Sequence, residues 1–444
     1  MDLTQFLPQF GSLAFTLVAF VIALSIIVAV HEYGHYIVGR WTGIKAEVFS
    51  LGFGPVLFAR TDRHGTRWQV AALPFGGYVK FLGDANAASV GGDDSRVAQS
   101  ERRQTMLGAP LWARAATVAA GPFANFLLSV LLFCALILSQ GRATDPLTVA
   151  ELVPLPESYV QELQPGDEIL EVAGRPVAVR TLGAALAEIP PEPSVDYLIR
   201  RDGEELVVRG PHPLPPVASS VSPDSAAWDV GIRSGDVVTA VDGRPVYAFD
   251  ELVASVLASE GRPIAFDIWR SGELLHFTVV PRRADLPVAE GGFETRWLVG
   301  VSGGPFFEAT TETPGLLTAL GDSLAQLWFV LGSSLSGIGH MLTGAISTCN
   351  LSGPVGIAET SGAMASQGTT SFIGFLAVLS AAVGLMNLFP IPILDGGHLV
   401  FHAWEAITGR PPTDRALRVL MAAGLSLLLT LMFWAVANDL FLCP

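Results

Sequence analysis

Two histidines and a glutamate have the spacing of a metal-binding motif. His31 and His35 are four residues apart, and Glu32 follows the first of them. Residues four apart share one face of an α-helix, so both imidazoles can bind one metal ion while the carboxylate serves as a general base. The motif lies at the end of an apolar window, residues 12–37, that is long enough to span a bilayer. Because ionisable groups are costly in such a segment, they indicate function.

A catalytic zinc ion needs a third protein ligand and an open position for water. We predict Asp395, which follows two closely spaced prolines in the apolar segment 371–401. The prolines break this helix and free backbone groups, which a membrane tolerates only where protein or a water-filled cavity receives them. His398 and His402 are alternative third ligands, ranked second because they lie nearer the interface.

The remaining polar groups of these segments suggest roles around a metal-bound water. Glu32 would take a proton from that water, because a bound zinc ion makes it far more acidic. Asn387 and Asn125 could hold the substrate backbone or a developing oxyanion. The alternative for each asparagine is hydrogen bonding between helices, which we favour for Asn125.

The composition is that of a membrane protein with a polar central region. Half of the 444 residues are hydrophobic, and only 15% are charged. We predict four membrane spans, at residues 12–37, 111–139, 371–394 and 416–437. The net charge of −15 comes mostly from the central region and argues against nucleic acid as a partner. The first apolar run is too long for a cleaved signal peptide and lacks a basic leader, so we expect it to be retained.

The distribution of basic residues predicts the direction of each span. Arginine and lysine are frequent in the loops 38–110 and 402–415, which are therefore expected on the cytoplasmic side. The termini and the central region are then outside. This arrangement places the polar residues of the spans at a similar depth, toward the cytoplasm: the histidine pair, Asn125, Asn387 and Asp395. Polar residues scattered at random along the spans would not be expected to share one depth.

Residues 44–82 predict an apolar β-hairpin directly after the metal-binding helix. One interpretation is a short sheet at the membrane surface. The other is an edge that pairs with an extended substrate strand, and the two are compatible. The candidate substrate-binding residues at this edge are Gly76, Gly77, Tyr78 and Lys80.

The central region contains an internal repeat with an offset of 69 residues. Gly166-Asp167 recurs as Gly235-Asp236, and Arg201-Asp202-Gly203-Glu204 recurs as Arg270-Ser271-Gly272-Glu273. We predict two tandem copies of one small domain, with helices over 182–189 and 249–259. They resemble circularly permuted bacterial PDZ domains, which take peptide C-termini or extended segments onto a sheet edge. Alternatively, one or both grooves are blocked and the domains act as a size filter, an interpretation given equal weight for the first copy.

A further apolar segment, residues 315–345, is interrupted by glycine and serine. A fifth span here would reverse the third and carry Asp395 away from His31. We therefore interpret the segment as an amphipathic helix at the outer membrane surface, followed by a turn at 351–356. Cys349 and Cys443 are both expected outside. A bond between them is one alternative, and two unpaired residues are the one that we favour.

Together these motifs resemble the site-2 protease family of intramembrane zinc metalloproteases, in particular the bacterial regulator of sigma-E protease type with tandem PDZ domains. The resemblance rests on His31-Glu32-Tyr33-Gly34-His35, the hairpin end 76–80, Gly121-Pro122 with Asn125, the repeated domains, Ser352-Gly353-Pro354-Val355 and residues 387–396. It implies one Zn²⁺ bound by His31, His35 and Asp395, with Glu32 as general base. It also implies a bacterial inner-membrane location, with periplasmic PDZ domains and an active site toward the cytoplasm.

The resemblance further implies what the protein acts on. Substrates would be transmembrane segments of single-span membrane proteins, such as anti-sigma factors already cut outside, or remnant signal peptides. Because helical amides are screened from attack, we expect the substrate to be partly unwound and held extended against the hairpin near residues 76–80. The PDZ pair would exclude substrates with bulky outer domains.

The predicted fold class is a multi-pass α-helical membrane protein with four transmembrane helices, a membrane-associated β-hairpin and two inserted α+β PDZ-like domains. The predicted order is helix 1 (1–40), hairpin and loop (41–110), helix 2 (111–140), PDZ-like domains (141–214 and 215–285), linker and surface helix (286–370), helix 3 (371–401), cytoplasmic loop (402–415) and helix 4 (416–440).

Two other functions are compatible with parts of the sequence. A non-catalytic membrane scaffold built on PDZ domains would have no need for an intact Glu32 and a complete ligand set. A metal transporter could use His and Asp in its spans, but it would need more polar residues along them and has no use for a general base. Both are weaker than the protease interpretation.

Overall fold

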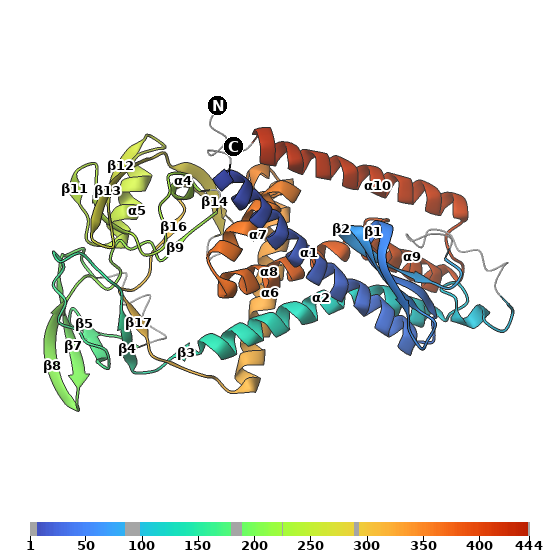
Figure 1. The fold of residues 1–444 in the computed structure, drawn as a ribbon, viewed down its shortest axis with the longest axis horizontal. Helices are drawn as coiled ribbons and strands as arrows, with labels where there is room; N and C mark the ends of the chain where they lie inside the picture. The colour runs from blue at the N-terminus through green and yellow to red at the C-terminus, as the bar shows by residue number, and fades with distance from the viewer. Residues whose placement is uncertain (1–6, 85–97, 179–188, 224, 288–292, 443–444) are drawn as a thin grey trace. The chain divides into compact units, whose positions relative to one another are not determined.

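The computed structural model describes residues 7–84, 98–178, 189–223, 225–287 and 293–442. The chain forms two compact units (Figure 1). The helical unit comprises residues 1–136, 317–339 and 351–444, and the repeat unit comprises residues 137–316 and 340–350. Each unit is described by itself.

The helical unit contains seven α-helices among the described residues. They are α1 (Leu7–Trp41), α2 (Leu111–Gln140), α6 (Leu316–Leu342), α7 (Pro354–Ser366), α8 (Thr369–Asn387), α9 (Asp395–Thr408) and α10 (Asp414–Ala437). Within the described ranges, five of these are long and apolar enough to cross a membrane: α1, α2, α6, α8 and α10. Four of the five coincide with the predicted spans.

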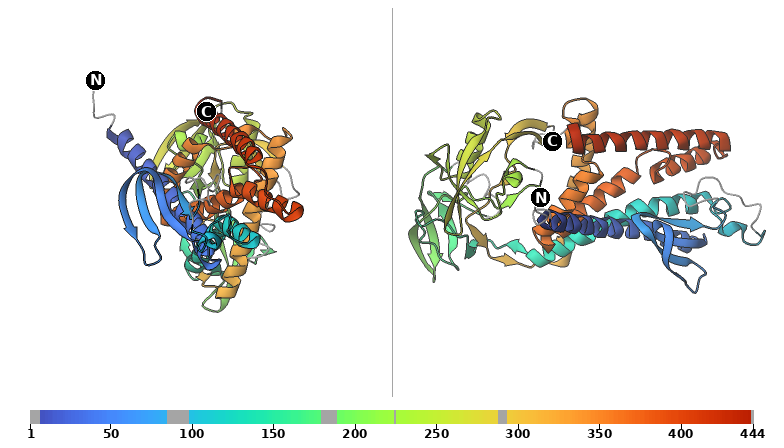
Figure 2. Two further views of the ribbon diagram at one scale, coloured as in Figure 1. Left: turned by 90° about the vertical axis from the view of Figure 1, so that its right-hand side faces the viewer. Right: turned by 45° about the horizontal axis from the view of Figure 1, so that its top comes forward.

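Helix α6 is the additional candidate, and its direction differs from that of the others. It runs across the direction of α2 and α10 in both Figure 1 and Figure 2. Its buried residues Leu327, Val330 and Leu331 pack against α2 and α8, where the contact is made partly by Ala377 and Ala381. Small residues allow helices to approach closely. The interpretation of α6 as a surface helix stays a prediction. The orientation of α6 across α2 and α10 favours it.

The third predicted span is broken where the two prolines occur. Helix α8 ends at Asn387, and α9 begins at Asp395 after a series of turns. Gly396 and Gly397 are buried against the backbone of these turns, because a Cβ atom at either position would collide with the carbonyl oxygen of Leu388 or Ile391. The close packing places the first turn of α9 against the segment that precedes it.

Helix α7 was not expected from the sequence, which predicted a turn and a linker there. The Asp439 carboxylate, just after α10, accepts hydrogen bonds from three backbone N–H groups at the start of α7: those of Gly353 (2.8 Å), Val355 (3.1 Å) and Gly356 (3.0 Å). A carboxylate at a helix N-terminus satisfies donors that have no partner within the helix. The motif Ser352-Gly353-Pro354-Val355 is therefore the start of a capped helix.

The predicted hairpin is confirmed, and it is folded over on itself. It consists of β1 (Ala46–Thr61) and β2 (Arg67–Phe81). Residues 46–51 pair with 77–81, residues 56–61 pair with 67–71, and residues 48–51 also lie beside 67–70. Positive φ angles at Gly52, Gly54 and Gly76 accommodate the change of direction. Among the described strands, the segment 77–81 thus forms one edge of the sheet.

The repeat unit contains the two predicted copies. The first has the sheet order β17-β4-β5-β7-β8. The strands are β4 (Leu147–Leu152), β5 (Glu168–Val172), β6 (Arg175–Pro176, paired with β5), β7 (Val195–Arg201), β8 (Glu204–Gly210) and β17 (Phe307–Ala309). The second contains β9 (Ser220–Val221), α4 (Ala226–Asp229), β10 (Val237–Val241), β11 (Arg244–Pro245), α5 (Phe249–Ala258), β12 (Ile264–Arg270) and β13 (Glu273–Val279). The helix expected over 182–189 lies almost entirely outside the described residues.

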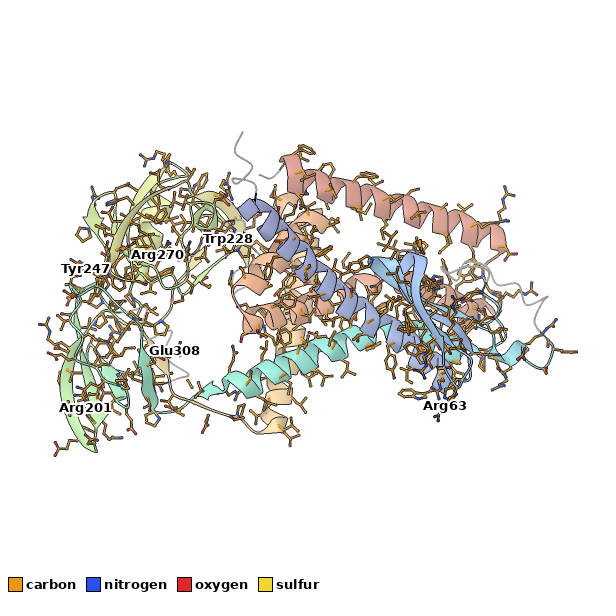
Figure 3. The ribbon with its side chains drawn as sticks, viewed as in Figure 1. Arg63, Arg201, Trp228, Tyr247, Arg270 and Glu308 are labelled. Carbon is orange, nitrogen blue, oxygen red and sulfur yellow. The ribbon has the colours of Figure 1, made fainter. Side chains whose placement is uncertain are left out.

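Matching ion pairs show that the copies share one framework. Arg201 donates two hydrogen bonds of 2.7 Å to Asp167, and Arg270 donates bonds of 2.6 and 2.7 Å to Asp236 (Figure 3 labels both arginines). Each aspartate is buried, and each arginine also donates to a backbone carbonyl at the equivalent position, Glu162 or Gly231. The 69-residue offset therefore extends to individual contacts. That the copies are PDZ domains stays a prediction.

The domain boundaries differ from those expected, because the second copy is inserted into the first. Strand β17 (Phe307–Ala309) returns to pair with β4, and Phe306 is fully buried beside Tyr197. Likewise β18 (Thr311–Glu312) pairs with β3 (Arg142–Ala143). The segment 286–312, expected to be a linker, thus supplies strands to the first copy.

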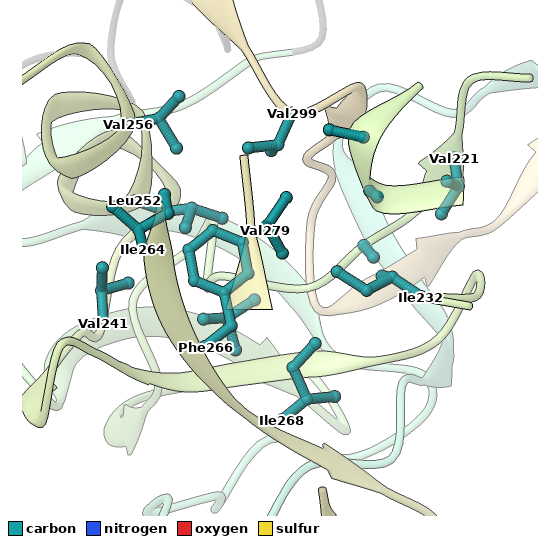
Figure 4. Packing of buried hydrophobic residues seen from close by; sticks show 14 of the residues in the cluster. Val221, Ile232, Val241, Leu252, Val256, Ile264, Phe266, Ile268, Val279 and Val299 are labelled. Carbon is teal, nitrogen blue, oxygen red and sulfur yellow. The ribbon is translucent and has the colours of Figure 1, made fainter. Parts of the chain in front are cut away.

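The second copy is also completed by residues beyond 285. After the hairpin of β14 (Arg282–Pro287) and β15 (Phe293–Leu298), strand β16 (Val301–Ser302) pairs with β9. Val299 is buried in the core of this copy with Phe266, Ile268 and Leu252 (Figure 4). The predicted boundary at residue 285 cuts through this core.

The three cysteines differ in state. Cys134 is free and buried in α2. Cys349 is disulfide-bonded, so the expectation of an unpaired residue is wrong for it. Cys443 lies outside the described residues.

Candidate metal centre

Helices α1 and α9 bring the three predicted metal ligands together. Nε2 of His31 lies 3.1 Å from Oδ2 of Asp395, and Nε2 of His35 lies 3.4 Å from the same oxygen. The two Nε2 atoms are 3.1 Å apart. Among the described residues this is the one cluster of His, Cys, Asp or Glu side chains with metal-ligand spacing. His398 and His402, the alternative ligands, are not part of it.

The dimensions of this triangle fit a zinc ion. Ligand atoms about 2.0–2.2 Å from a tetrahedral zinc lie about 3.3–3.6 Å from one another, close to the observed 3.1–3.4 Å. Oδ2 of Asp395 is buried without a hydrogen-bond partner, although two imidazole nitrogens are close to it. Three donor atoms therefore point toward one centre, and a cation there would satisfy all of them.

The second nitrogen of each imidazole has a partner on α2. Nδ1 of His35 lies 2.8 Å from the carbonyl oxygen of Thr117. Donation of a proton to this oxygen fixes the tautomer that leaves Nε2 free for a metal ion. The sequence did not point to Thr117, because any residue type can supply a backbone carbonyl.

Asn125 of α2 lies beside the other histidine. Its fully buried side-chain amide lies 3.3 Å from Nδ1 of His31, and its Oδ1 has no partner in the present orientation. Turning the amide over would let Oδ1 accept a hydrogen bond from Nδ1–H of His31, in the tautomer required for metal binding. This position favours a role in orienting His31 over direct substrate binding.

Two glycines allow α1 and α2 to approach closely at this point. A Cβ atom at Gly121 would collide with the rings of both His35 and His31. A Cβ atom at Gly34 would collide with the carbonyl oxygen of Ala120 and approach Cβ of Ala124 to 2.7 Å. The site therefore depends on the absence of side chains at both positions.

Glu32 and the edge of the hairpin border a cavity of about 420 Å³ that contains the three ligands. Gly77 packs against Glu32, whose Cγ would lie 3.1 Å from a Cβ atom at that position. Of the predicted substrate-binding residues, Gly77, Tyr78 and Asn387 line the cavity. Gly76, Lys80 and Asn125 do not, and Lys80 forms an ion pair with Glu47 at 2.9 Å.

A histidine pair four residues apart on a helix, with a glutamate after the first and a carboxylate from a second helix beside them, is an arrangement expected of a zinc metalloprotease. The chain belongs to Peptidase family M50, the site-2 protease family. The sequence pattern of this family matches residues 19–431 of the chain. A relative from Rhizobium meliloti, named as a zinc metalloprotease, is 36% identical over 436 residues, 97% of each chain. The regulator of sigma-E protease RseP of Salmonella typhimurium is 32% identical over 455 residues, 96% of this chain and 99% of the relative.

These comparisons establish the coarse activity. The chain is a zinc-dependent protease of a membrane-embedded family, and its helices are suited to a multi-pass arrangement. The fit of the ligand triangle to zinc agrees with that assignment.

Proposed function

We propose that this protein cleaves the transmembrane segments of single-span membrane proteins, using His31, His35 and Asp395 as zinc ligands. The observation that carries the proposal is the convergence of these three groups beside Glu32, within helices long enough to span a bilayer. A zinc ion held there would polarise the scissile carbonyl and make a bound water acidic. Glu32, beside the ligands, would accept a proton from the attacking water and pass it to the departing amine.

The edge of the hairpin holds the substrate in an extended form. Segment 77–81 pairs with 46–51 and forms an edge of the sheet, and Gly77, Tyr78 and Val79 line the cavity. An extended peptide added to this edge would present its carbonyl beside Glu32 and the ligands. Asn387 binds the substrate backbone; its place in the lining of the cavity, where it also donates to the carbonyl of Val383 at 3.0 Å, supports this role.

The substrates are of the anti-sigma-factor type, with remnant signal peptides as a second group. The name of the Salmonella typhimurium relative, a regulator of sigma-E protease, supports this assignment. The location is the bacterial inner membrane, with the repeated PDZ-like domains in the periplasm. There they bind extended peptide segments or exclude substrates whose outer domain has not yet been removed.

Cleavage of a tagged single-span membrane peptide in proteoliposomes tests the catalytic assignment. Glu32→Gln should lower the cleavage rate by about 10²–10⁴-fold while the protein retains its zinc. His31→Ala should lose both zinc and activity. Cleavage by Glu32→Gln at the wild-type rate would disprove the role of Glu32, and inactivity of the zinc-loaded wild type on all such peptides would disprove the substrate class.

N-methylation of the substrate backbone separates strand pairing from simple unwinding. A methyl group removes one N–H donor and also weakens the substrate helix. If unwinding alone limits cleavage, N-methylation near the scissile bond should accelerate the reaction. If the substrate pairs with the hairpin edge, cleavage should slow at alternate positions only, because successive N–H groups of a strand point in opposite directions. Uniform acceleration would contradict the pairing.

A further inference from the structure

A buried ion pair joins α2 and α9. On α9 it lies at the end of the helix away from Asp395, and on α2 it lies one turn before Thr117. Nη2 of Arg114 lies 2.6 Å from Oε1 of Glu405, and the two side chains are only 11% and 18% exposed. Charged groups are expensive to bury beside apolar helices, so such a pair calls for a function. Neither residue contacts the three metal ligands through any hydrogen bond or ion pair of the described residues.

The pair lies at the end of two stripes of residues, one on α2 and one on α9, and the cavity is lined by Thr117 and Arg114 of the first and by all of the second. On α2 the stripe is formed by Asn125, Gly121, Thr117 and Arg114, and on α9 by Asp395, His398, His402 and Glu405. These spacings of three, four or seven residues place each set on one side of its helix. The first three residues of the α2 stripe contact the imidazoles of α1. Arg114 extends the same stripe to α9.

Helix α9 has few other contacts to hold it in place. Its only buried residues are Gly396 and Gly397, both in the first turn. Farther along, Val400, Trp404 and Ile407 are 50%, 56% and 85% exposed. Beyond its first turn, no buried apolar side chain fixes the rotation of this helix about its axis. The ion pair with Arg114 is a contact that can do so.

We propose that Arg114 and Glu405 are a positioning pair, which sets the rotation and depth of α9 and thereby keeps Asp395 in the metal site. The proposal rests on Asp395 being the third zinc ligand. A slip of one residue along α9 would move Asp395 by about 1.5 Å and rotate it by about 100°. The distance between a metal ion and a ligand atom can vary by only about 0.2 Å. A weakly held α9 would therefore lower the affinity for zinc.

The ion pair is poorly suited to a role in stability alone. Nε of Arg114 is buried without a partner, and so is Nδ1 of His402 on the same stripe of α9. A buried pair whose donors are incompletely satisfied offsets little of its desolvation cost. Its value to the protein is therefore geometric: it permits one alignment of α2 and α9 and disfavours the others.

Metal titration of the full-length protein in detergent tests this role. Co²⁺ serves as the probe, because its visible spectrum reports the coordination geometry. Arg114→Gln and Glu405→Gln should each weaken Co²⁺ binding by about 10-fold and alter the spectrum. The double variant should lose no more than either single variant, because both act through one contact. Arg114→Lys keeps the charge and should bind Co²⁺ almost normally.

Glu101→Gln is the matched control, since it removes a carboxylate that pairs with Lys45 at 3.5 Å elsewhere in the helical unit. It should leave the Co²⁺ affinity and spectrum unchanged. If the single variants fail to fold, the double variant, which leaves no unpaired charge, must still bind Co²⁺ more weakly than Arg114→Lys does. Unchanged affinity in the pair variants, or losses that add in the double variant, would overturn the proposal.

Asp395→Asn distinguishes failure of the positioning role from failure of the ligand assignment. If Asp395→Asn leaves the Co²⁺ affinity and spectrum unchanged, Asp395 is not a ligand, and the proposed catalytic site is wrong. If Asp395→Asn weakens binding while the Arg114 and Glu405 variants do not, the ligand set stands and only the positioning role is wrong.

Discussion

At the scale of single residues, the site is defined as much by missing side chains as by ligands. The rings of His31 and His35 occupy the space that a Cβ atom of Gly121 would need. We expect Gly121→Ala to displace the imidazoles and weaken zinc binding by about 10-fold or more, measured by equilibrium dialysis. Gly374→Ala on α8 is the control, because its Cβ would meet only Leu136 at 3.8 Å. Equal affinities for the two variants would contradict the steric role of Gly121.

Asn125 allows a similarly sharp comparison. If its amide oxygen accepts a hydrogen bond from Nδ1–H of His31, then Asn125→Asp retains the acceptor and Asn125→Leu removes it. We expect Asn125→Leu to lower the zinc affinity by about 10–100-fold and Asn125→Asp to lower it much less. Identical losses in both variants would show that Asn125 contributes packing only.

At the scale of elements, Asp439 determines how α7 begins. Its carboxylate accepts three backbone hydrogen bonds at the N-terminus of that helix. Asp439→Asn removes the charge and one acceptor, and should cost about 0.5–2 kcal/mol of local stability. Hydrogen exchange of the Val355 and Gly356 amides should accelerate, while the amides of α8 serve as an internal reference. Unchanged exchange at both amides would show that the cap is not stabilising.

The turn of the hairpin is organised by another carboxylate. Asp62 accepts hydrogen bonds from Trp68 Nε1 (3.0 Å), the backbone N–H groups of Thr66 (3.0 Å) and His64 (2.8 Å), and the hydroxyl of Tyr36 (3.2 Å). Burial alone would raise the pKa of Asp62, but the hydrogen bonds, with that of Trp68 the strongest, lower it below its ordinary value of 3.8. The carboxylate of Asp62 therefore binds a proton less tightly in the folded state than in the unfolded state.

This pKa shift predicts the pH dependence of the turn. A lowered pKa means that Asp62 stabilises the turn above the unfolded pKa, and that the contribution is lost as the pH falls through the lower, folded pKa. Protection of the His64 and Thr66 amides, corrected for intrinsic exchange, should stay constant down to about pH 4 and fall below it. In Asp62→Asn the protection should be lower and independent of pH in this range. The same acid response in Asp62→Asn would assign it to another group.

At the scale of the whole molecule, the repeat unit is nested instead of tandem. Phe306 follows the second copy in sequence, yet it is fully buried in the core of the first. We expect Phe306→Ala to lower the free energy of unfolding of the first copy by about 3–5 kcal/mol. Limited proteolysis of the full-length protein should then cut within residues 147–210. Val207→Ala, at a side chain that is 65% exposed, is the control. Cleavage confined to the region around residue 306 would contradict the nested architecture.

Much of the helical unit was predictable because its signals are local. The bilayer selects long apolar runs, and four of the five candidate spans were found in this way. The spacing of His31 and His35 follows from the helical period. Asp395 could be proposed as the third ligand because two prolines near a carboxylate mark a broken helix, and because charge in the loops predicted the direction of each span. The repeat was visible as identical turn residues at a constant offset.

The remaining features depend on contacts between residues that are distant in sequence. Helix α7 consists largely of small and polar residues, so its pattern does not predict a helix until Asp439 caps it. Strand β17 pairs with β4 across an entire inserted domain, which no local periodicity records. Thr117 acts through its backbone, and Arg114 and Glu405 are recognisable only as a pair.

The sequence by itself therefore determined which groups this chain brings to zinc chemistry: two histidines, an adjacent glutamate and a carboxylate in helices suited to a membrane. Residue type and helical spacing suffice for that conclusion. The tertiary structure decided whether the three ligand atoms meet and what holds them. That outcome depends on how closely α1 and α2 pack at Gly34 and Gly121 and on the rotation of α9, and both are properties of packing between elements.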